Sequence, residues 1–255
     1  MLINLEGKVG LVVGVANENS ISWGCAKKMH DSKAQLAVTY ASEKTKQYTK
    51  PLIDQINCPI FLPGNVEKED EIKQVFAAIE KTWGKLDFLL HAIAFAPQKD
   101  LHGRVVDCSR EGFLKTLDIS CYSLIQLSKL AEPLMKDGGS ILTVSYYGST
   151  KVIKNYNIMG VAKAALESTV RYLANDLGTK NIRVNGLSPG PIMTRAASGI
   201  SDFKELLDIA VQKSPLHRGV DINSVGNLAA FMVSDLAKDI TGDILYIDAG
   251  YSVIG

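Results

Sequence analysis

The sequence predicts an α/β fold of the doubly wound, Rossmann-like class, with about seven parallel strands flanked by helices. Short apolar runs alternate with longer segments of helical periodicity along the whole chain of 255 residues. The runs are continuously apolar, which is typical of parallel strands covered on both faces. Repeated strand–helix units of this spacing favour an open parallel sheet. No linker, charge block or internal repeat divides the chain, so we predict one domain over residues 1–255.

The same pattern assigns the individual elements. The expected strands are residues 9–13, 35–40, 60–63, 88–92, 140–145, 183–188 and 243–248. The expected helices are residues 21–31, 45–56, 68–83, 110–135, 157–177 and 222–236. Gly178 follows the fifth of these helices as a C-terminal capping glycine. Asp202, with Glu205 three residues later, resembles a capping box for a short helix after Ile200.

Composition limits the classes of function. The chain has 28 basic and 27 acidic residues, and the resulting net charge of +1 disfavours nucleic acid as a partner. The four cysteines (Cys25, Cys58, Cys108 and Cys121) show no paired CxxC spacing, as expected for free thiols in a reducing compartment. We find no secretory signal and no apolar run near the ~20 residues of a membrane span. A cytoplasmic protein without a metal site or an integral membrane span is therefore expected.

The turn after the first strand has the character of a phosphate-binding turn. Gly14 permits a tight turn, and the helix that starts at Ile21 presents its positive end there. Ser20 stands where the usual G-x-G-x-x-G pattern has glycine, and Gly24 is expected to permit close helix–sheet packing. The segment from Gly14 to Gly24 is thus either a dinucleotide-binding turn or a plain turn.

The ends of the next strands are the expected positions of the cofactor's adenosine half. Neither an Asp for NADH nor an Arg for NADPH ends the second strand, although Glu43 or Lys46 lies close by. Asn65, after the third strand, has the donor and acceptor of an adenine contact but is equally suited to capping a helix. His91, at the end of the fourth strand, fits a hydrogen-bonded core histidine better than a catalyst. Ile93 and its small neighbours are expected along the adenosine ribose.

The helix over residues 157–177 carries the candidate chemical groups. Tyr156 and Lys163 are seven residues apart, so they lie on nearly one line about 10.5 Å long, opposite the apolar stripe. Gly160 lies between them, where alanine is favoured by ~1 kcal/mol in a helix, and a glycine there indicates close approach of a ligand or a neighbour. Two further tyrosines, Tyr146 and Tyr147, follow the fifth strand, and Tyr147 is the one expected to serve packing.

Motifs in the same order along nearly the whole chain resemble the short-chain dehydrogenase/reductase superfamily. More closely, they are similar to the bacterial NADH-dependent enoyl-acyl-carrier-protein reductases. The matching segments are residues 14–21, 91–97, 118–120, 145–148, 155–164, 188–192, 196–203 and 242–250. Carbonyl reductases of the superfamily carry tyrosine four residues before the lysine, a position that Met159 occupies here. In enoyl reduction the hydride goes to the β-carbon, so the oxyanion forms further from the nicotinamide and a shifted tyrosine is consistent with that chemistry.

The resemblance implies reduction of trans-2-enoyl thioesters to saturated acyl thioesters, in the last step of each fatty-acid elongation cycle. Tyr156 would hydrogen-bond to the thioester oxyanion, Lys163 would hold the nicotinamide ribose, and Tyr146 would orient the thioester. The cofactor is expected to be NADH, with NADPH left open. Its implied contacts are Gly14, Ser20, Ile21, Ala41, Asn65, Val66, Ile93, Lys163, Ile192, Met193, Thr194, Arg195 and Ala196. The implied substrate contacts are Ala96, Tyr146, Tyr156, Met159, Ala197, Ile200 and Phe203.

The same resemblance implies partners and a covering segment. Residues 193–212, inserted after the sixth strand, are expected to cover the substrate. The substrate would arrive on an acidic acyl carrier protein, with Arg195, Lys204 and Lys151 as docking candidates. A homotetramer is expected through the helices at 110–135 and 157–177. Two rival hypotheses are a carbonyl-reducing member of the superfamily and a non-catalytic nucleotide sensor.

The chain also departs from the family pattern at several positions near the cofactor. The family often has Asp where Asn65 stands, a change that would alter the adenine contact without abolishing it. Gln is common where Ala41 stands, and this change weakens a choice between NADH and NADPH from these residues. Pro189 and Arg195 replace residues that are more often Ala and Leu.

Overall fold

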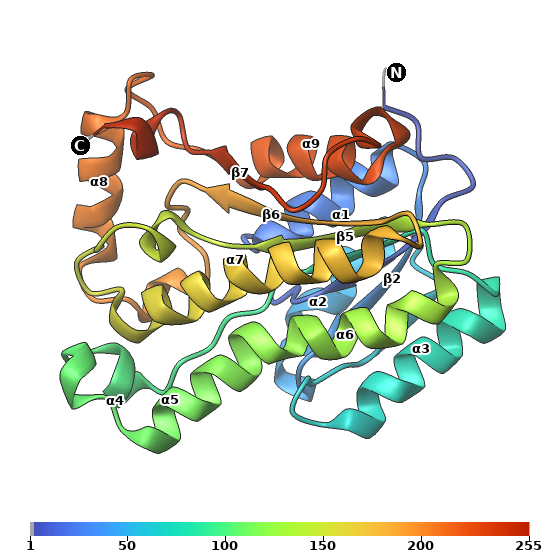
Figure 1. Ribbon diagram of the computed structural model, residues 1–255, viewed down its shortest axis with the longest axis horizontal. Helices are drawn as coiled ribbons and strands as arrows, with labels where there is room; N and C mark the ends of the chain where they lie inside the picture. The colour runs from blue at the N-terminus through green and yellow to red at the C-terminus, as the bar shows by residue number, and fades with distance from the viewer. Residues whose placement is uncertain (1–2, 255) are drawn as a thin grey trace.

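A single sheet of seven parallel strands organises the computed structural model, which describes residues 3–254 (Figure 1). The strand order is β3-β2-β1-β4-β5-β6-β7, and every neighbouring pair is parallel. The strands are β1 (Val9–Val13), β2 (Gln35–Tyr40), β3 (Ile60–Pro63), β4 (Phe88–His91), β5 (Gly139–Val144), β6 (Ile182–Pro189) and β7 (Ile244–Ile247). The predicted fold class is confirmed, and each expected strand is present within about two residues of its predicted bounds.

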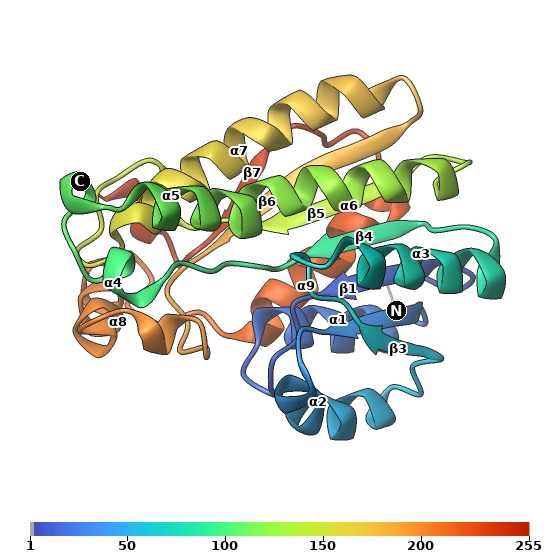
Figure 2. The same ribbon diagram turned by 90° about the horizontal axis from the view of Figure 1, so that it is seen from below.

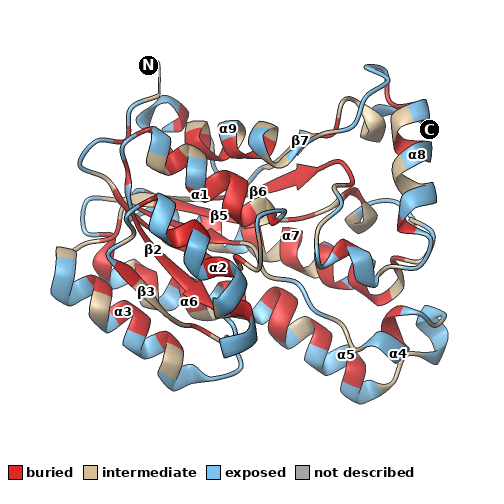
Figure 3. Ribbon diagram, turned by 180° about the vertical axis from the view of Figure 1, so that it is seen from behind, coloured by how far each residue is buried: buried red, intermediate tan, exposed pale blue. Residues whose placement is uncertain are grey.

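Helices cover both faces of the sheet, as Figures 1 and 2 show. One face carries α1 (Ile21–Asp31), α2 (Glu43–Gln55) and α9 (Ile222–Val233). The other carries α3 (Glu69–Trp83), α5 (Arg110–Leu117), α6 (Ser123–Ala131) and α7 (Asn157–Gly178). Two further helices, α4 (Gln98–Leu101) and α8 (Phe203–Lys213), both lie at the end of the molecule toward which the strands run (Figure 1). Burial follows this layering, since the central strands are buried and the helices mainly on their inner sides (Figure 3).

The helix predicted over residues 110–135 is interrupted. A π-helical turn, Asp118–Tyr122, separates α5 from α6. Within it the Ser120 hydroxyl accepts from the Phe95 amide at 2.9 Å and donates to the Phe95 carbonyl at 3.0 Å. The Ser123 hydroxyl donates to the Ile119 carbonyl at 2.6 Å. π-Turns of this kind are frequent at functional sites, and this one sets Ile119 and Ser120 against the loop that follows β4.

Two predicted capping features are wrong. Gly178 belongs to α7 itself, and the left-handed residue that follows the helix is Asn181, with a φ of 58°. Asp202 precedes α8 but adopts a left-handed conformation with a φ of 56°, whereas a side-chain N-cap needs extended backbone. Its carboxylate accepts a hydrogen bond from Asn155 Nδ2 at 3.2 Å instead.

Gly24 permits close packing as predicted, but the prediction that it packs against the sheet is wrong. Gly24 faces helix α9 rather than the sheet, and a Cβ on it would lie 2.3 Å from the Ile222 carbonyl oxygen. Gly226 of α9 faces back toward α1 in the same way, 2.4 Å from the Gly24 carbonyl oxygen. The pair of glycines therefore lets α1 and α9 cross at close range on one face of the sheet.

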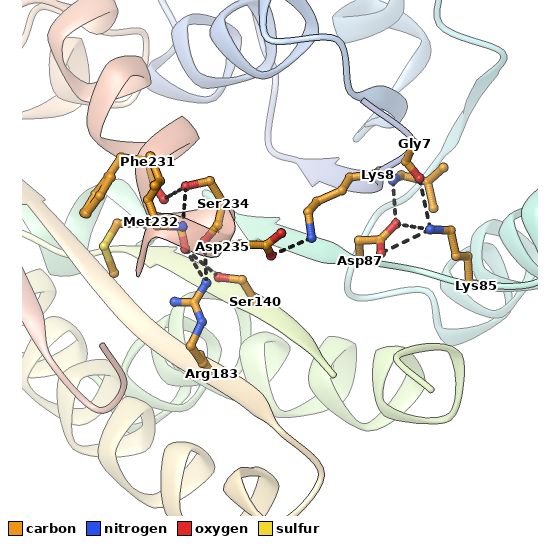
Figure 4. A network of polar contacts seen from close by, with 12 residues as sticks. Gly7, Lys8, Lys85, Asp87, Ser140, Arg183, Phe231, Met232, Ser234 and Asp235 are labelled. Carbon is orange, nitrogen blue, oxygen red and sulfur yellow. Dashed lines mark hydrogen bonds and ion pairs between the residues drawn. The ribbon is translucent and has the colours of Figure 1, made fainter. Parts of the chain in front are cut away.

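At the amino ends of the strands, a half-buried arginine fixes helix α9 to the sheet (Figure 4). Arg183 of β6 donates to the carbonyl oxygens of Met232 at 2.6 Å and Ile240 at 3.2 Å. The Met232 carbonyl is one of those that the end of helix α9 leaves unpaired, and the Ile240 carbonyl belongs to the loop before β7. Nearby, Lys8 and Asp235 form an ion pair at 2.8 Å. The contacts at the amino ends of the strands thus stabilise the fold, and the carboxyl ends are left for a functional site.

Candidate functional site

A cavity of about 870 Å³ opens outside the carboxyl ends of the strands. It reaches from Gly14, after β1, to Phe203 at the start of α8. The strand order changes direction between β1 and β4, and such a switch point is where open α/β sheets bind their ligands. All the residues predicted to bind cofactor or substrate line this cavity except Met193, whose side chain is 48% exposed.

The turn at one end of the cavity has no room for a side chain at its first residue. Gly14 has a φ of 111°, and a Cβ there would lie 2.1 Å from the Ala92 carbonyl oxygen. The Ser20 hydroxyl accepts hydrogen bonds from the amides of Ala16 at 3.1 Å and Asn17 at 3.0 Å. Ser20 therefore closes the turn through its side chain, where the usual pattern has a glycine. The amino end of α1 is left facing the cavity, as an anionic pyrophosphate requires.

The middle of the cavity has the character of a nucleoside pocket. Val66 and Ile93 supply apolar walls, and Ala41 leaves space at the end of β2. Asn65 lines the cavity, and its Oδ1 also accepts from the Glu67 amide at 3.0 Å in a turn ahead of α3. The residues present therefore fit a dinucleotide cofactor. A close turn, a helix amino end and apolar walls follow one another along one crevice.

At the other end of the cavity Tyr146, Tyr156 and Lys163 converge. The rings of the two tyrosines meet edge to face with centroids 4.8 Å apart. Lys163 is 4% exposed and donates from Nζ to the Val144 carbonyl oxygen at 2.5 Å. The buried Tyr146 hydroxyl has no hydrogen-bond partner among the residues that the structure describes. A substrate oxygen at this end would therefore meet hydroxyl donors in a region closed to bulk water.

Burial sets the protonation of these groups. It lowers the pKa of Lys163 to about 8, an effect that the nearby Glu167 carboxylate opposes. The pKa of Tyr156 is raised by burial and, to a lesser extent, by Tyr146 and Glu167. Burial likewise raises the pKa of Tyr146. Both tyrosines are consequently proton-carrying donors at neutral pH.

The glycine in the middle of α7 allows close approach of a neighbouring segment. A Cβ on Gly160 would lie 2.8 Å from the Gly148 carbonyl oxygen. A Cβ on Gly148 would in turn lie 2.4 Å from the Tyr156 ring. Of the two readings of Gly160, the structure thus selects a neighbour: the turn after β5 packs directly on α7, which brings Tyr146 against Tyr156.

Apolar side chains line the cavity beyond the tyrosines. Leu101, Tyr156 and Met159 form a small buried cluster, against which Ala96 and Ile200 pack. Ala197 and Phe203 close the far end of the cavity. This end is suited to a hydrocarbon chain, since it offers apolar walls next to the polar end of Tyr156.

Comparisons with known proteins agree with this geometry. Residues 14–252 match the family model described as enoyl-(acyl carrier protein) reductase. The chain belongs to this family. It is 50% identical over 98% of its length to the enoyl-[acyl-carrier-protein] reductase [NADH] FabI of Rickettsia typhi, covering 96% of that protein. The corresponding FabI of a Nostoc species is 48% identical, with all of both chains covered.

Solved structures lead to the same family. The crystal structure of the Anaplasma phagocytophilum reductase in complex with NAD matches with a TM-score of 0.95 at 45% identity, over 98% of this chain and 96% of that one. The Bacillus cereus reductase, solved with NADP+ and indole naphthyridinone, matches with a TM-score of 0.96 at 43% identity, over 98% of both chains. The predicted family and enzyme class are confirmed, and the names of the relatives specify the predicted cofactor, NADH.

Two residues that were expected to serve packing do so. His91 is fully buried; its Nδ1 shares a hydrogen bond with Thr143 Oγ1 and its Nε2 with Ser123 Oγ, both at 2.8 Å. Burial and the charge of Lys163 lower the pKa of His91 to about 3, so the ring is neutral. The ring of Tyr147 packs against Tyr251 with centroids 5.8 Å apart. Neither residue faces the cavity.

Sequence reasoning missed several residues of the site. Leu101 is one, because the four-residue α4 is too short for a periodic pattern. Ile119 reaches the cavity through the π-turn, which no local pattern announces. Glu167 is buried on α7, and its spacing of four residues after Lys163 gave no distinct signal, because exposed ion pairs on helices have the same spacing.

The described part of the chain holds neither a membrane-spanning helix nor a cluster of metal ligands. In residues 3–254 no helix is both long and apolar enough to cross a membrane. The same residues hold no group of three or more metal-ligating side chains. All four cysteines are free thiols. The cytoplasmic location stays a prediction.

Proposed function

We propose that this chain reduces trans-2-enoyl thioesters at the end of the cavity where Tyr146, Tyr156 and Lys163 meet. The observation that carries the assignment is the position of the two tyrosines, edge to face at 4.8 Å, beside the buried ammonium. Met159 occupies the position four residues before the lysine, so the phenol comes from one helical turn earlier. This offset suits an oxyanion on the thioester carbonyl, two bonds beyond the carbon that is reduced.

Each group has a definite task in this proposal. The Tyr156 hydroxyl donates to the thioester oxygen and stabilises the enolate that develops there. The protonated Lys163 adds positive charge and is placed to hold the cofactor ribose. Tyr146, whose hydroxyl has no partner within residues 3–254, donates a second hydrogen bond that orients the thioester. The saturated thioester forms once the enolate takes a proton at its α-carbon.

NADH supplies the hydride for the β-carbon when it is bound. The Gly14 turn and the amino end of α1 would hold its pyrophosphate, and Asn65, Val66 and Ile93 would hold its adenosine. Ile192, Thr194, Arg195 and Ala196 line the same crevice near Lys163 and would enclose its nicotinamide end. Met193, which is exposed, is left as a backbone contact.

The acyl chain would lie in the apolar end of the cavity under residues 193–212. Within this segment Ala197, Ile200 and Phe203 face the cavity, while Arg195 and Lys204 are exposed beside it. Lys151 is exposed as well. We assign these three cations to docking of an acidic acyl carrier protein that brings the substrate.

A second copy of the chain is the expected occupant of the outer face of α5, α6 and α7. Large apolar side chains are exposed there, namely Phe113, Leu114, Tyr122, Ile125, Val161 and Tyr172. These helices lie side by side in Figure 2. Such a patch is typical of an interface, and a homotetramer built through it is our proposal. A monomer in sedimentation at micromolar concentration would contradict it.

The decisive assay follows the loss of NADH absorbance with a crotonyl thioester and with longer enoyl thioesters. We expect turnover that increases when the acyl group is presented on a carrier protein. A 3-oxoacyl thioester of the same chain length is the control substrate, and we expect no NADH oxidation with it. Turnover of the oxo compound alone would assign a carbonyl reductase, and cofactor binding without turnover of either would assign a nucleotide sensor.

A further inference from the structure

A buried carboxylate lies behind the proposed catalytic groups. Glu167 is 6% exposed and stands one helical turn beyond Lys163 in α7. Its Oε1 accepts hydrogen bonds from the hydroxyls of Ser145 at 2.5 Å and Ser149 at 2.6 Å. The mechanism above gives this residue no role.

The two serines bracket the segment that carries Tyr146. Ser145 follows the last residue of β5, and Ser149 ends the 3₁₀ turn Tyr147–Ser149. Glu167 therefore holds both ends of a five-residue turn with one carboxylate oxygen. Since Gly148 of this turn also meets α7 at Gly160, the turn has little freedom to move while the carboxylate is in place.

Helix α7 also binds the end of β5 through a second side chain. Lys163 donates to the carbonyl oxygen of Val144, and Glu167 accepts from the side chain of the next residue, Ser145. Two charged side chains one turn apart on α7 thus bind two consecutive residues of the strand end, one as a hydrogen-bond donor and the other as an acceptor. Any shift of β5 along α7 would break both contacts, so Tyr146, Tyr156 and Lys163 are fixed relative to one another.

The charge of Glu167 has a separate effect. Burial lowers the pKa of Lys163 to about 8. The negative charge of Glu167 raises this pKa and is the largest of the effects that oppose burial. Cys121, on the π-turn, acts in the same direction. His91, which faces Lys163 from β4, is neutral because its own pKa lies near 3. Tyr146 and Tyr156 complete the surroundings and are uncharged at neutral pH.

We propose that Glu167 is a positioning residue of the reduction, which holds the Tyr146 turn on α7 and keeps Lys163 in its protonated form. The inference rests on the proposed roles of Tyr146 and Lys163. The proposed role requires the negative charge of Glu167. A buried carboxylate is costly to desolvate, and a neutral amide of the same shape would hold the two serines at lower cost. We therefore assign the negative charge of Glu167 to stabilising the ammonium group of Lys163.

The central experiment is Glu167→Gln in the full-length protein. Glutamine keeps the shape and can still bond to both hydroxyls, but it removes the charge. Without that charge the pKa of Lys163 falls, so the protonated form is lost at lower pH. We expect the alkaline limb of kcat/KM to move toward acid pH, with about a tenfold loss at pH 8 and a much smaller one at pH 6.

A binding measurement separates this effect from chemistry. NADH affinity, titrated by fluorescence between pH 6 and pH 9, should show the same acid shift because Lys163 is proposed to hold the ribose. Ser149→Ala is the matched control, since it removes one hydrogen bond and leaves the charge. We expect it to lose less than about threefold in kcat/KM, with an unchanged pH profile.

A further variant keeps the proposal testable if Glu167→Gln does not fold. Ser145→Ala frees the residue before Tyr146 while the carboxylate stays, so the KM for the enoyl thioester should rise with NADH affinity unchanged. A folded Glu167→Gln protein with wild-type pH profiles for both turnover and NADH binding would overturn the charge role. Unchanged KM in Ser145→Ala would overturn the positioning role. If the wild-type protein binds NADH but reduces no enoyl thioester, the proposed function fails first, and the pH dependence of NADH binding still tests Glu167.

Discussion

Tyr146 and Tyr156 meet edge to face at 4.8 Å although one precedes the 3₁₀ turn after β5 and the other precedes the first turn of α7. Edge-to-face pairs of this kind are favourable by about 0.5–1.5 kcal/mol beyond the area they bury. The contact depends on Gly148, whose missing side chain leaves space for the Tyr156 ring. The pair therefore fixes two hydroxyl groups of different surroundings at one end of the cavity, and the two are expected to respond differently to substitution.

Tyr156→Phe removes the hydroxyl proposed to donate to the developing oxyanion. Loss of one such donor typically lowers kcat by about a hundredfold or more, while the ring stays to fill its site. We expect this loss with NADH affinity within about twofold of wild type, because the ribose contact is assigned to Lys163. Steady-state kinetics with an enoyl thioester and a fluorescence titration of NADH measure the two quantities. A variant that keeps more than half of the wild-type kcat would remove Tyr156 from the mechanism.

Tyr146→Phe is expected to separate stability from activity. The Tyr146 hydroxyl is buried without a partner in the described part of the chain, so removing it relieves an unpaired polar group. We expect the free energy of unfolding to rise by about 1 kcal/mol and the KM for the enoyl thioester to increase. Chemical denaturation and initial rates test this pair of changes. A less stable variant with unchanged KM would indicate that the hydroxyl serves the fold.

The fold was predictable because its signals are local. Continuous apolar runs and helical periods define the seven strands and the long helices, and these depend on nearest neighbours in the sequence. The π-turn was not predictable, because it depends on the bonds between Ser120 and Phe95, which are far apart in the chain. Asp202 failed as a cap for a similar reason, since its left-handed backbone places its carboxylate beside Asn155.

Residues that belong to a sequence motif were predicted for the site and line one cavity, whereas residues that only packing brings there were missed. The spacing of Tyr156 and Lys163, and the Gly14 turn, are visible in the sequence itself. Glu167 has the same local pattern as a solvent-facing glutamate, and only the tertiary approach of Ser145 and Ser149 makes it a buried acceptor. Buried polar networks of this type are set by the whole fold and leave no periodic trace.

His91 should make the protein sensitive to mild acid. Its pKa is about 3 in the folded state against an ordinary 6.5, so the unfolded chain binds the extra proton between these values. Stability therefore falls as the pH drops below 6.5, by about 2 kcal/mol at pH 5 from this residue. His91→Gln should flatten the slope between pH 7 and pH 5, where most carboxylates still keep their charge. Equal slopes in urea denaturation of the two proteins would contradict the assignment.

Arg183→Met tests the contacts at the amino ends of the strands, away from the cavity. The guanidinium donates to the carbonyl oxygens of Met232 and Ile240, and methionine removes these two hydrogen bonds. The same oxygens still accept from Ser140 Oγ and Asn185 Nδ2, so neither is left unpaired. We therefore expect a loss of about 1–2 kcal/mol in the free energy of unfolding. The kcat of the folded protein should not change, because these contacts lie opposite the cavity. A lower kcat at unchanged stability would show that the two ends of the strands are coupled.

Gly160→Ala tests whether close packing of the Tyr146 turn is needed for activity. Alanine is favoured over glycine in a helix by ~1 kcal/mol, so propensity alone predicts a more stable protein. The new Cβ, however, would lie 2.8 Å from the Gly148 carbonyl oxygen, and the turn must move to accommodate it. We expect a net loss of stability and about a tenfold lower kcat/KM, since small misplacements of positioning groups are costly.

Gly178→Ala, in the same helix, is the matched control. Within the described residues, no neighbouring atom lies within 4 Å of a Cβ placed at this position. This substitution should therefore give the gain from helix propensity, about 0.5–1 kcal/mol, with full activity. Thermal unfolding and kinetics of both variants decide the matter. If Gly160→Ala were stabilised like the control and fully active, the contact between Gly160 and Gly148 would have no role in holding Tyr146 against Tyr156.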